Sequence, residues 1–440
     1  MGVSYSPIKL FGQPKMAALL VLGFASGLPY FLTSRTLQAW MTTSGVDLAT
    51  IGMFSLVALP YSLKFLWAPL LDRYIPPFLG RRRGWIFILQ LVLMIAIGAM
   101  MFRNPTRSIQ LIAINALVIA FVSATYDIAF DAYRTDVLEH REMGAGASMG
   151  VLGYRLALIL TGSLALILAD SIPWPMVYAI MAGTLLLPMI ATFRAPEPVL
   201  KDKGPQSLRD AVILPFGEFF QRVGPARAFA ILGFIVLYKL SDYLAAAMAT
   251  PFLLEIGFTQ TQIGAIQGGI GMVTTIVGTL AGGLVVARLG INRSLWVFGL
   301  LQAASNLMYY LLAVVGQNTA LLTTAMIVEN FCTGLVTAGF VAFLMSLCSV
   351  RFSATQYALL SSLMSFSRDL LTSRSGEIAE STGWPSYFLI TLAAGVPGLL
   401  LLPIFAPWNK DQPLGAAEHT GAVTNADGDQ ETPRAGTEVR

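Results

Sequence analysis

The positions where this sequence could do chemistry are ionisable residues that interrupt apolar runs. Ten of them stand in runs long enough to cross a bilayer: Arg35, Lys64, Asp127, Asp131, Arg155, Lys239, Asp242, Glu329, Arg368 and Asp369. A charge at bilayer depth is costly and marks a functional site by default. Five cations and five carboxylates predict paired networks, and a carboxylate without a cation would hold a proton instead. These residues are therefore the first candidates for moving protons within a membrane.

The first cluster lies on one predicted helix. Asp127 and Asp131 are four residues apart and share one helix face, and Arg134 follows one turn later. The two like charges repel, and Lys64 or Arg155, at similar predicted depth, could supply the compensating charge. A proton site and a structural ion-pair network are both open interpretations for Asp127, whereas the structural one is favoured for Asp131.

The second cluster combines two predicted helices. Lys239 and Asp242 are three residues apart, and Glu329 lies near the middle of its own run. We expect Glu329 and Lys239 to be the coupling pair, in which the carboxylate takes up a proton when the lysine moves away. A static Lys–Glu bridge is the competing interpretation, and Asp242 is a further candidate proton carrier.

Composition sets the environment of these charges. Of 440 residues, 55% are hydrophobic and only 12% are charged, against about 25% in soluble domains. Apolar runs predict an all-α membrane protein with twelve transmembrane helices. The expected spans are 16–43, 50–71, 83–102, 108–134, 145–170, 175–194, 227–253, 260–286, 294–314, 319–349, 355–379 and 383–406.

The spans fall into two sixes. We expect an N-terminal six-helix bundle over 1–194, a cytoplasmic connector over 195–226, a C-terminal six-helix bundle over 227–406 and a disordered cytoplasmic tail over 407–440. Most of the 28 Lys and Arg residues fall on the side of the two termini, which predicts that both termini are cytoplasmic. The basic residues lie in short loops between spans, so nucleic-acid binding is not expected.

Several function classes are excluded by what the sequence lacks. It contains no H-E-x-x-H, no G-x-S-x-G and no P-loop motif, so neither a membrane enzyme nor an ATPase is expected. The two histidines, His140 and His419, lie outside the spans, so a proton relay would use carboxylates. Cys332 and Cys348 are too far apart on one helix for a disulfide and lack the spacing of a zinc site, and no metal is expected.

Two loops at equivalent places suggest a duplicated fold. LLDRYIPPFLGRRRG follows the second span and AGGLVVARLGINRS follows the eighth. Both resemble the G-x-x-x-D-R-x-G-R-R loop of the major facilitator superfamily, although Ala287 replaces the Asp in the second. Such loops can clamp helix ends through charge-assisted hydrogen bonds, whereas simple positive-inside anchoring is the alternative. The gate-loop candidates are Asp72, Arg73, Arg81, Arg82, Arg83 and Arg288.

Longer segments resemble one family within that superfamily. GFASGLPYFLTSRTLQAWMT, YDIAFDAYRTDVL, GAGASMGVLGYRLAL and FSATQYALLSSL are similar to the AmpG muropeptide permeases, and the similarity runs from about residue 10 to residue 405. The resemblance implies the major facilitator fold and proton-driven import of GlcNAc–anhydroMurNAc, with or without a stem peptide, across the bacterial inner membrane. It also implies roles in peptidoglycan recycling and β-lactamase induction. A carrier of another anionic solute, such as acetyl-CoA, is the alternative, and Arg35 stands where the family has Gly.

A sugar-peptide cargo requires hydrogen-bonding and aromatic groups in the cavity. The candidates are Arg35, Gln38, Tyr61, Tyr126, Gln267, Asn330 and Arg368, with Tyr154, Tyr238, Gln302 and Asn306 as further possibilities. Buried amides must be paired or face water, which favours Gln267 and Asn330, and Arg35 or Arg368 could bind carboxylates. No cofactor is expected because the proton-motive force would drive transport, and a monomer is expected.

Overall fold

The computed structural model describes residues 7–198, 205 and 207–408. Most of the expected tail, 407–440, and part of the connector lie outside the described residues. Within them the chain is helical and contains no β-strand. This agrees with the all-α fold predicted from the apolar runs.

The described N-terminal half contains twelve α-helices, joined in places by short 3₁₀ or π segments. They are α1 (Pro7–Phe11), α2 (Pro14–Leu32), α3 (Arg35–Thr43), α4 (Leu48–Met53), α5 (Leu59–Leu63), α6 (Ala68–Arg73), α7 (Arg81–Ala99), α8 (Ile109–Val137), α9 (Met143–Ile159), α10 (Ala165–Ala169), α11 (Trp174–Gly183) and α12 (Leu186–Arg194). The expected span 50–71 is not one helix, because 3₁₀ turns at Phe54–Ala58 and Lys64–Leu66 separate α4, α5 and α6. Proline at the first turn of α5 and of α6 is consistent with helices that restart there.

The connector and the C-terminal half contain the remaining helices. They are α13 (Leu208–Val223), α14 (Pro225–Leu237), α15 (Leu240–Glu255), α16 (Gln260–Gly264), α17 (Met272–Val315), α18 (Thr319–Ser346), α19 (Ser353–Thr372), α20 (Ser375–Thr382) and α21 (Trp384–Phe405). α17 merges two expected spans at Gly290, whose backbone is non-helical with φ +79°. The chain reverses there, since Gln317 beyond α17 donates to the carbonyl of Gly257 before α16.

Nine helical segments of the described chain are long and apolar enough to cross a membrane. One of them, Gln262–Val315, contains the two expected spans that meet at Gly290. The expected spans 50–71 and 355–379 do not meet the same criterion, the first because it is broken and the second because α19 is the more polar helix. The number twelve therefore stays a prediction.

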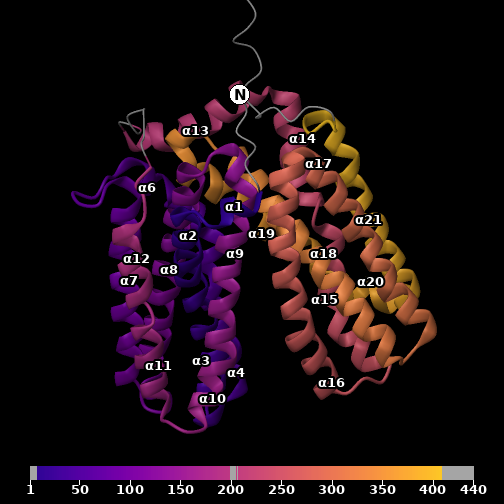
Figure 1. Ribbon diagram of the computed structural model, residues 1–440. Helices are drawn as coiled ribbons and strands as arrows, with labels where there is room; N and C mark the ends of the chain where they lie inside the picture. Colours follow the sequence, from indigo (N-terminus) through magenta and orange to yellow (C-terminus); the bar gives the residue numbers. More distant parts are fainter. Residues whose placement is uncertain (1–6, 199–204, 206, 409–440) are drawn as a thin grey trace, which may run out of the picture.

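The two halves form separate bundles that meet at one end (Figure 1). α13 lies across this end, which we call the connector end, and the bundles diverge toward the opposite end, where α10 and α16 lie. Glycines allow the closest packing within the N-terminal half: a Cβ on Gly153 of α9 would lie 1.9 Å from the Leu20 carbonyl oxygen of α2. The packing interface between α2 and α9 therefore requires glycine on both helices.

Candidate functional site

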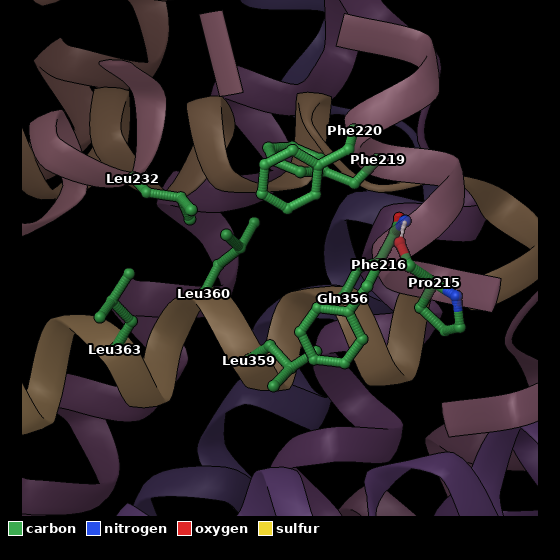
Figure 2. Close-up of a pocket in the computed structure, with 9 residues that line it drawn as sticks. All are labelled: Pro215, Phe216, Phe219, Phe220, Leu232, Gln356, Leu359, Leu360 and Leu363. Carbon is green, nitrogen blue, oxygen red and sulfur yellow. Dashed lines mark hydrogen bonds between the residues drawn. The ribbon is translucent and has the colours of Figure 1, made fainter. Parts of the chain in front are cut away.

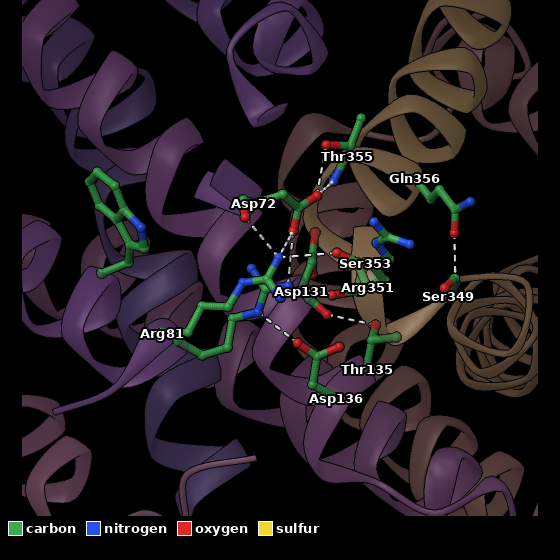
Figure 3. A network of polar contacts seen from close by, with 12 residues as sticks. Asp72, Arg81, Asp131, Thr135, Asp136, Ser349, Arg351, Ser353, Thr355 and Gln356 are labelled. Atoms are coloured by element: carbon green, nitrogen blue, oxygen red, sulfur yellow. Dashed lines mark hydrogen bonds and ion pairs between the residues drawn. The ribbon is translucent and has the colours of Figure 1, made fainter. Parts of the chain in front are cut away.

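Asp72 is the centre of the contacts that join the halves at the connector end. Its Oδ1 accepts from Arg81 Nη2 at 2.9 Å and from Arg82 Nη2 at 3.0 Å, both in its own half. Its Oδ2 accepts from the backbone N–H and the hydroxyl of Thr355 in the other half, at 2.8 and 2.7 Å. Figure 3 shows Asp72 between the Arg81 side chain and Thr355. The carboxylate is fully buried.

This arrangement caps a helix of one half with a side chain of the other. Thr355 lies in the first turn of α19, where backbone N–H groups have no partner within the helix. The residue before the helix, Phe352, forms no side-chain cap. Asp72 supplies the missing acceptor and places its negative charge at the positive end of the helix dipole. Separation of the halves would remove this cap from α19 and leave Asp72 bound only to Arg81 and Arg82.

Two arginines extend the contact. Arg82 Nε donates to Asp136 at 2.6 Å in α8, and its Nη2 donates to Ser353 Oγ at 2.7 Å across the halves. Arg81 Nη2 donates to the Arg351 carbonyl oxygen at 3.1 Å. Arg82 is fully buried, so its charge is neutralised only by the two aspartates. The first gate loop therefore joins neighbouring helix ends in this conformation, and its role as a gate stays a prediction.

The remaining gate-loop candidates lie outside this cluster. Arg83 pairs with Glu197 at 3.2 Å and ties α7 to the segment after α12. Arg73 is half-buried and stacks on the Tyr74 ring at 5.7 Å. Arg288 is exposed and forms no ion pair within the described residues. The second loop copy, with Ala287 in place of Asp, therefore lacks the carboxylate that organises the first.

In the N-terminal half, the two carboxylates of α8 have different partners. Asp127 accepts from Ser26 Oγ of α2 at 2.5 Å and has no cation within ion-pair distance in the described chain. Asp131 lies 3.6 Å from Lys64 Nζ and 2.8 Å from Arg134 Nη2. The expected partnership with Lys64 is thus formed by Asp131 alone.

Two further contacts involve cations near this cluster. Arg134 also donates to the hydroxyl of Tyr357 on α19, which extends the Asp131 ion pair to the other half. Arg155, expected to compensate the α8 carboxylates, does not reach them. It is half-buried, forms no ion pair with a described residue, and its Nε has no hydrogen-bond partner. Its electrostatic neighbours include Asp242 of the C-terminal half.

In the C-terminal half, the expected Lys239–Glu329 pair is wrong for this conformation. Lys239 Nζ lies 3.7 Å from Asp242 Oδ2, one turn along its own helix. Glu329 instead accepts from the hydroxyl of Tyr309 at 2.8 Å. Thr333 of α18, one turn beyond Glu329, donates to Asp242 at 3.4 Å and brings the two carboxylates into one buried cluster.

The expected substrate residues divide into structural and accessible groups. Tyr126 is fully buried and donates to the Leu22 carbonyl oxygen at 2.9 Å, so its hydroxyl is not available to a substrate. Asn330 also serves packing, since its amide accepts from Thr275 of α17 at 3.0 Å and donates to the Met326 carbonyl oxygen. Both side chains are engaged within the protein in this state, and their role in substrate binding stays a prediction.

The other expected substrate residues keep some exposure. Gln38 and Arg35 are exposed at the start of α3, where the Arg35 guanidinium lies 5.7 Å from the Phe31 ring. Arg368 is exposed and lies 6.0 Å from the Tyr243 ring. Tyr61 and Gln267 are half-buried. Their role in binding stays a prediction.

Most of the further candidates for substrate binding form hydrogen bonds within the protein. Tyr238 donates to the Leu295 carbonyl oxygen at 2.8 Å, and Asn306 donates to Ser241 at 2.5 Å. Gln302 donates to Asp242 at 3.4 Å, so it belongs to the C-terminal carboxylate cluster. Tyr154 is half-buried on α9, beside Arg155.

The sequence interpretation missed several partners of these groups. Asp136, Thr355 and Tyr357 complete the connector-end contacts, and Ser26 and Tyr309 bind the two carboxylates that lack a cation. Thr355 and Tyr357 belong to FSATQYALLSSL, a segment quoted above for family resemblance only. No three His, Cys, Asp or Glu side chains of the described residues are grouped so that they could hold a metal ion.

The family follows from comparison with known proteins. The family model described as Major Facilitator Superfamily matches residues 18–371. The chain belongs to the major facilitator superfamily. It is 48% identical over 397 residues to a protein of Escherichia coli K12 named anhydromuropeptide permease, covering 90% of this chain and 80% of that protein. Identity at this level also places it in the family of that permease.

Other relatives and solved structures agree with this assignment. A putative transporter of Rickettsia felis, AmpG 4, is 32% identical and covers 90% of this chain and 97% of its own. The transporter FucP in its outward conformation has a TM-score of 0.67 at 14% identity, covering 88% of this chain and 98% of that one. The proton:xylose symporter XylE has a TM-score of 0.68 at 13% identity, and the match covers 93% of this chain and 98% of XylE. The chain is therefore a multi-pass membrane transporter, not an enzyme.

Proposed function

We propose that this protein imports anhydromuropeptides across the bacterial inner membrane in symport with protons. The observation that carries the substrate is its 48% identity, over 90% of the chain, to the anhydromuropeptide permease. No relative reported above is named for acetyl-CoA or another anionic solute, and this alternative is not favoured. The bias of Lys and Arg supports an arrangement in which the connector end and both termini face the cytoplasm.

The asymmetric contact between the halves supports alternating access. The halves are bonded at the connector end through Asp72 and Arg134 and diverge at the other end (Figure 1). In the proposed orientation, this state receives substrate from the periplasm. Import then requires the connector-end bonds to break while the opposite ends of the bundles close.

Glu329 is our first candidate for the coupling carboxylate. It is buried and accepts a hydrogen bond from the neutral Tyr309 hydroxyl. It lies in the same cluster as Asp242, whose charge is balanced by Lys239. A second negative charge there is not balanced by any described cation within ion-pair distance. Glu329 is therefore suited to carry a proton through the cycle. Asp127, which binds Ser26 alone, is the second candidate.

Arg155 is our candidate for the anionic part of the substrate. A muropeptide carries carboxylate groups, and an arginine binds carboxylates through two parallel hydrogen bonds. Arg155 is a half-buried cation of α9 without an ion pair in the described chain, and the Asp242 cluster of the other half is within electrostatic range. A substrate carboxylate would supply the missing negative charge between the halves.

Uptake into sealed membrane vesicles tests the proposal. We expect labelled GlcNAc–anhydroMurNAc to accumulate when a proton gradient is imposed and to stop accumulating when a protonophore is added. Vesicles without the protein are the control. Accumulation that ignores the protonophore would refute proton coupling, and absence of any uptake or counterflow of this sugar would refute the substrate.

A further inference from the structure

An apolar cavity lies beneath the connector helix. It has a volume of about 260 Å³, is bordered by α13, α14 and α19, and is open on one side. Its lining residues are Pro215, Phe216, Phe219, Phe220, Leu232, Gln356, Leu359, Leu360 and Leu363. Figure 2 shows these side chains around a common centre, with Phe219 and Phe220 on α13 facing Leu360 on α19. Gln356 of the lining directly follows Thr355, which binds Asp72, so the cavity borders the connector-end contacts.

The chemistry of the lining excludes a polar occupant. Gln356 is the only lining residue with a polar side chain, and its amide is already used. Its Nε2 donates to the Pro215 carbonyl oxygen at 3.0 Å and to Glu218 at 2.7 Å, while its Oε1 accepts from the backbone of Ser349 at 2.6 Å. A water molecule needs two to four polar partners, so neither water, sugar nor peptide finds a site there. A hydrocarbon chain matches the lining.

The position of α13 identifies the source of that chain. The helix presents Leu208, Val212 and Phe216 on one exposed stripe, each about half exposed, as helices do that lie in a membrane interface. α14, which closes another side of the cavity, begins a segment long and apolar enough to cross the bilayer. The cavity is therefore placed where an interfacial helix meets the start of a membrane-spanning segment.

An exposed cation lies near the start of α14, the helix that supplies Leu232 to the lining. Arg227, in the first turn of α14, is exposed and forms no ion pair within the described residues. It precedes by two residues Phe229, whose ring packs against Phe220 of the cavity lining at 5.4 Å. An anionic headgroup near Arg227 would balance this charge while its acyl chain fills the cavity. We propose that an anionic phospholipid binds between α13, α14 and α19, with one acyl chain in this cavity.

Photolabelling in a lipid bilayer tests the site. The full-length protein is placed in nanodiscs that contain a small share of phosphatidylglycerol with a diazirine on its acyl chain, and labelled peptides are mapped by mass spectrometry. We expect severalfold more adducts on the peptides spanning 215–220 and 359–363 than at Leu400 of α21, which is 70% exposed. Equal labelling at the cavity and at Leu400 would overturn the proposal.

A cavity-filling variant makes the test specific. Leu360→Trp should lower the cavity adducts about tenfold, because excluding even two methylene groups weakens binding by roughly that factor. Leu300→Trp is the matched control, since Leu300 is exposed on α17, away from the cavity. If Leu360→Trp does not fold, Leu363→Phe fills less of the space. Unchanged adducts in a folded filling variant would contradict acyl-chain binding in the cavity.

Further labelling experiments test the role of the headgroup and distinguish the phospholipid from other occupants of the cavity. Arg227→Gln should reduce labelling by phosphatidylglycerol and leave labelling by phosphatidylethanolamine unchanged. If a diazirine-labelled free fatty acid labels the cavity and the phospholipid does not, the occupant is a free fatty acid and not a phospholipid. Cross-links from the cavity to peptides of 409–440 would instead assign the space to this chain's own tail. Either result overturns the proposal.

Discussion

At the scale of residues, Asp72 shows how one carboxylate can hold two halves of a transporter together. One oxygen binds the arginines of its own half, and the other binds the start of α19 in the opposite half. Opening must remove the second set of bonds while the first keeps the carboxylate in place. The bonds from Asp72 to α19 can therefore break and re-form while Arg81 and Arg82 keep the carboxylate in position.

We expect Asp72→Asn to weaken the closed connector end. Removing one partner of a buried ion pair costs about 3–5 kcal/mol, because Arg81 and Arg82 would lose their shared negative charge. Spin labels on cysteines replacing Arg141 and Arg288, both exposed and in different halves, should report longer distances. Arg73→Gln, outside the cluster, is the control. A distance distribution identical to that of the parent protein would contradict the role of Asp72.

Glu329→Gln tests coupling at a single side chain. Glutamine keeps the shape and can still accept the Tyr309 hydroxyl bond, but it cannot exchange a proton. We expect uphill uptake to be lost while counterflow of substrate continues. Glu255→Gln, at an exposed glutamate of the same half, should leave both activities unchanged. If uphill uptake survives in Glu329→Gln, Glu329 is not the coupling carboxylate, and Asp127 becomes the first candidate.

Arg155→Gln tests substrate binding. Hydrogen bonds to charged groups contribute about 1.5–3 kcal/mol, so KM for an anionic muropeptide should rise roughly ten- to hundredfold. Arg155→Lys should recover part of the loss, because it restores the charge without the two parallel donors. The uptake kinetics of each variant give KM and the maximal rate separately. An unchanged KM in Arg155→Gln would remove this residue from the binding site.

The sequence predicted some of these contacts and missed others for one physical reason. The loop motif indicated a clamp at Asp72 and the arginines after it, and predicted depth indicated that Lys64 lies near the α8 carboxylates. Neither gives the rotation of one helix against another. Lys239 and Glu329 have suitable depths, yet Lys239 turns toward Asp242 on its own helix.

At the scale of elements, hydrophobicity predicted membrane spans better than it predicted continuous helices. The span 50–71 is mostly apolar, with Lys64 as its one charge, but its structure is broken into α4, α5 and α6. Hydrophobicity indicates whether a segment lies in lipid or in water. Prolines such as Pro60 and Pro69 determine where its backbone hydrogen bonds are interrupted. The opposite case occurs at Gly290. There the chain reverses at one residue, and two expected spans are joined into the single element α17.

Gly153→Ala tests the packing interface between α2 and α9. The added Cβ would lie 1.9 Å from the Leu20 carbonyl oxygen, so the helices must move apart. Overpacking of this kind typically costs about 1–3 kcal/mol, and backbone contact puts the effect at the upper end. We expect a lower thermal unfolding temperature in detergent. Gly183→Ala, where nothing lies within 4 Å of the added atom, should unfold like the parent, and equal values for both variants would contradict tight packing.

At the scale of the whole molecule, two similar halves make an asymmetric contact. The first gate loop has Asp72 and binds the start of α19, whereas the second has Ala287 and leaves Arg288 exposed. The duplicated loop predicted a clamp mainly at the Asp72 copy, because Ala287 replaces the carboxylate in the second copy. The connector end is therefore held mainly by the clamp on the N-terminal side.

Cys348 offers a native reporter of this closure. It lies two residues beyond α18, next to Leu347, whose carbonyl oxygen accepts from Arg222 of α13 at 2.6 Å. Burial raises the pKa of the Cys348 thiol, so less thiolate is present at a given pH and maleimide reacts slowly. Opening the connector end hydrates the thiol and lowers its pKa toward the ordinary value.

In a Cys332→Ser background, Cys348 is the only cysteine, and its labelling rate at neutral pH should rise when Asp72→Asn is added. Each unit by which the pKa falls gives about tenfold more thiolate while the pKa remains above the pH. The gain should shrink at alkaline pH, where the thiol ionises even when buried. Labelling in denaturant, where both proteins must react alike, is the control. A rate that Asp72→Asn does not change would mean that the α13 side of the connector end stays closed when the clamp is lost.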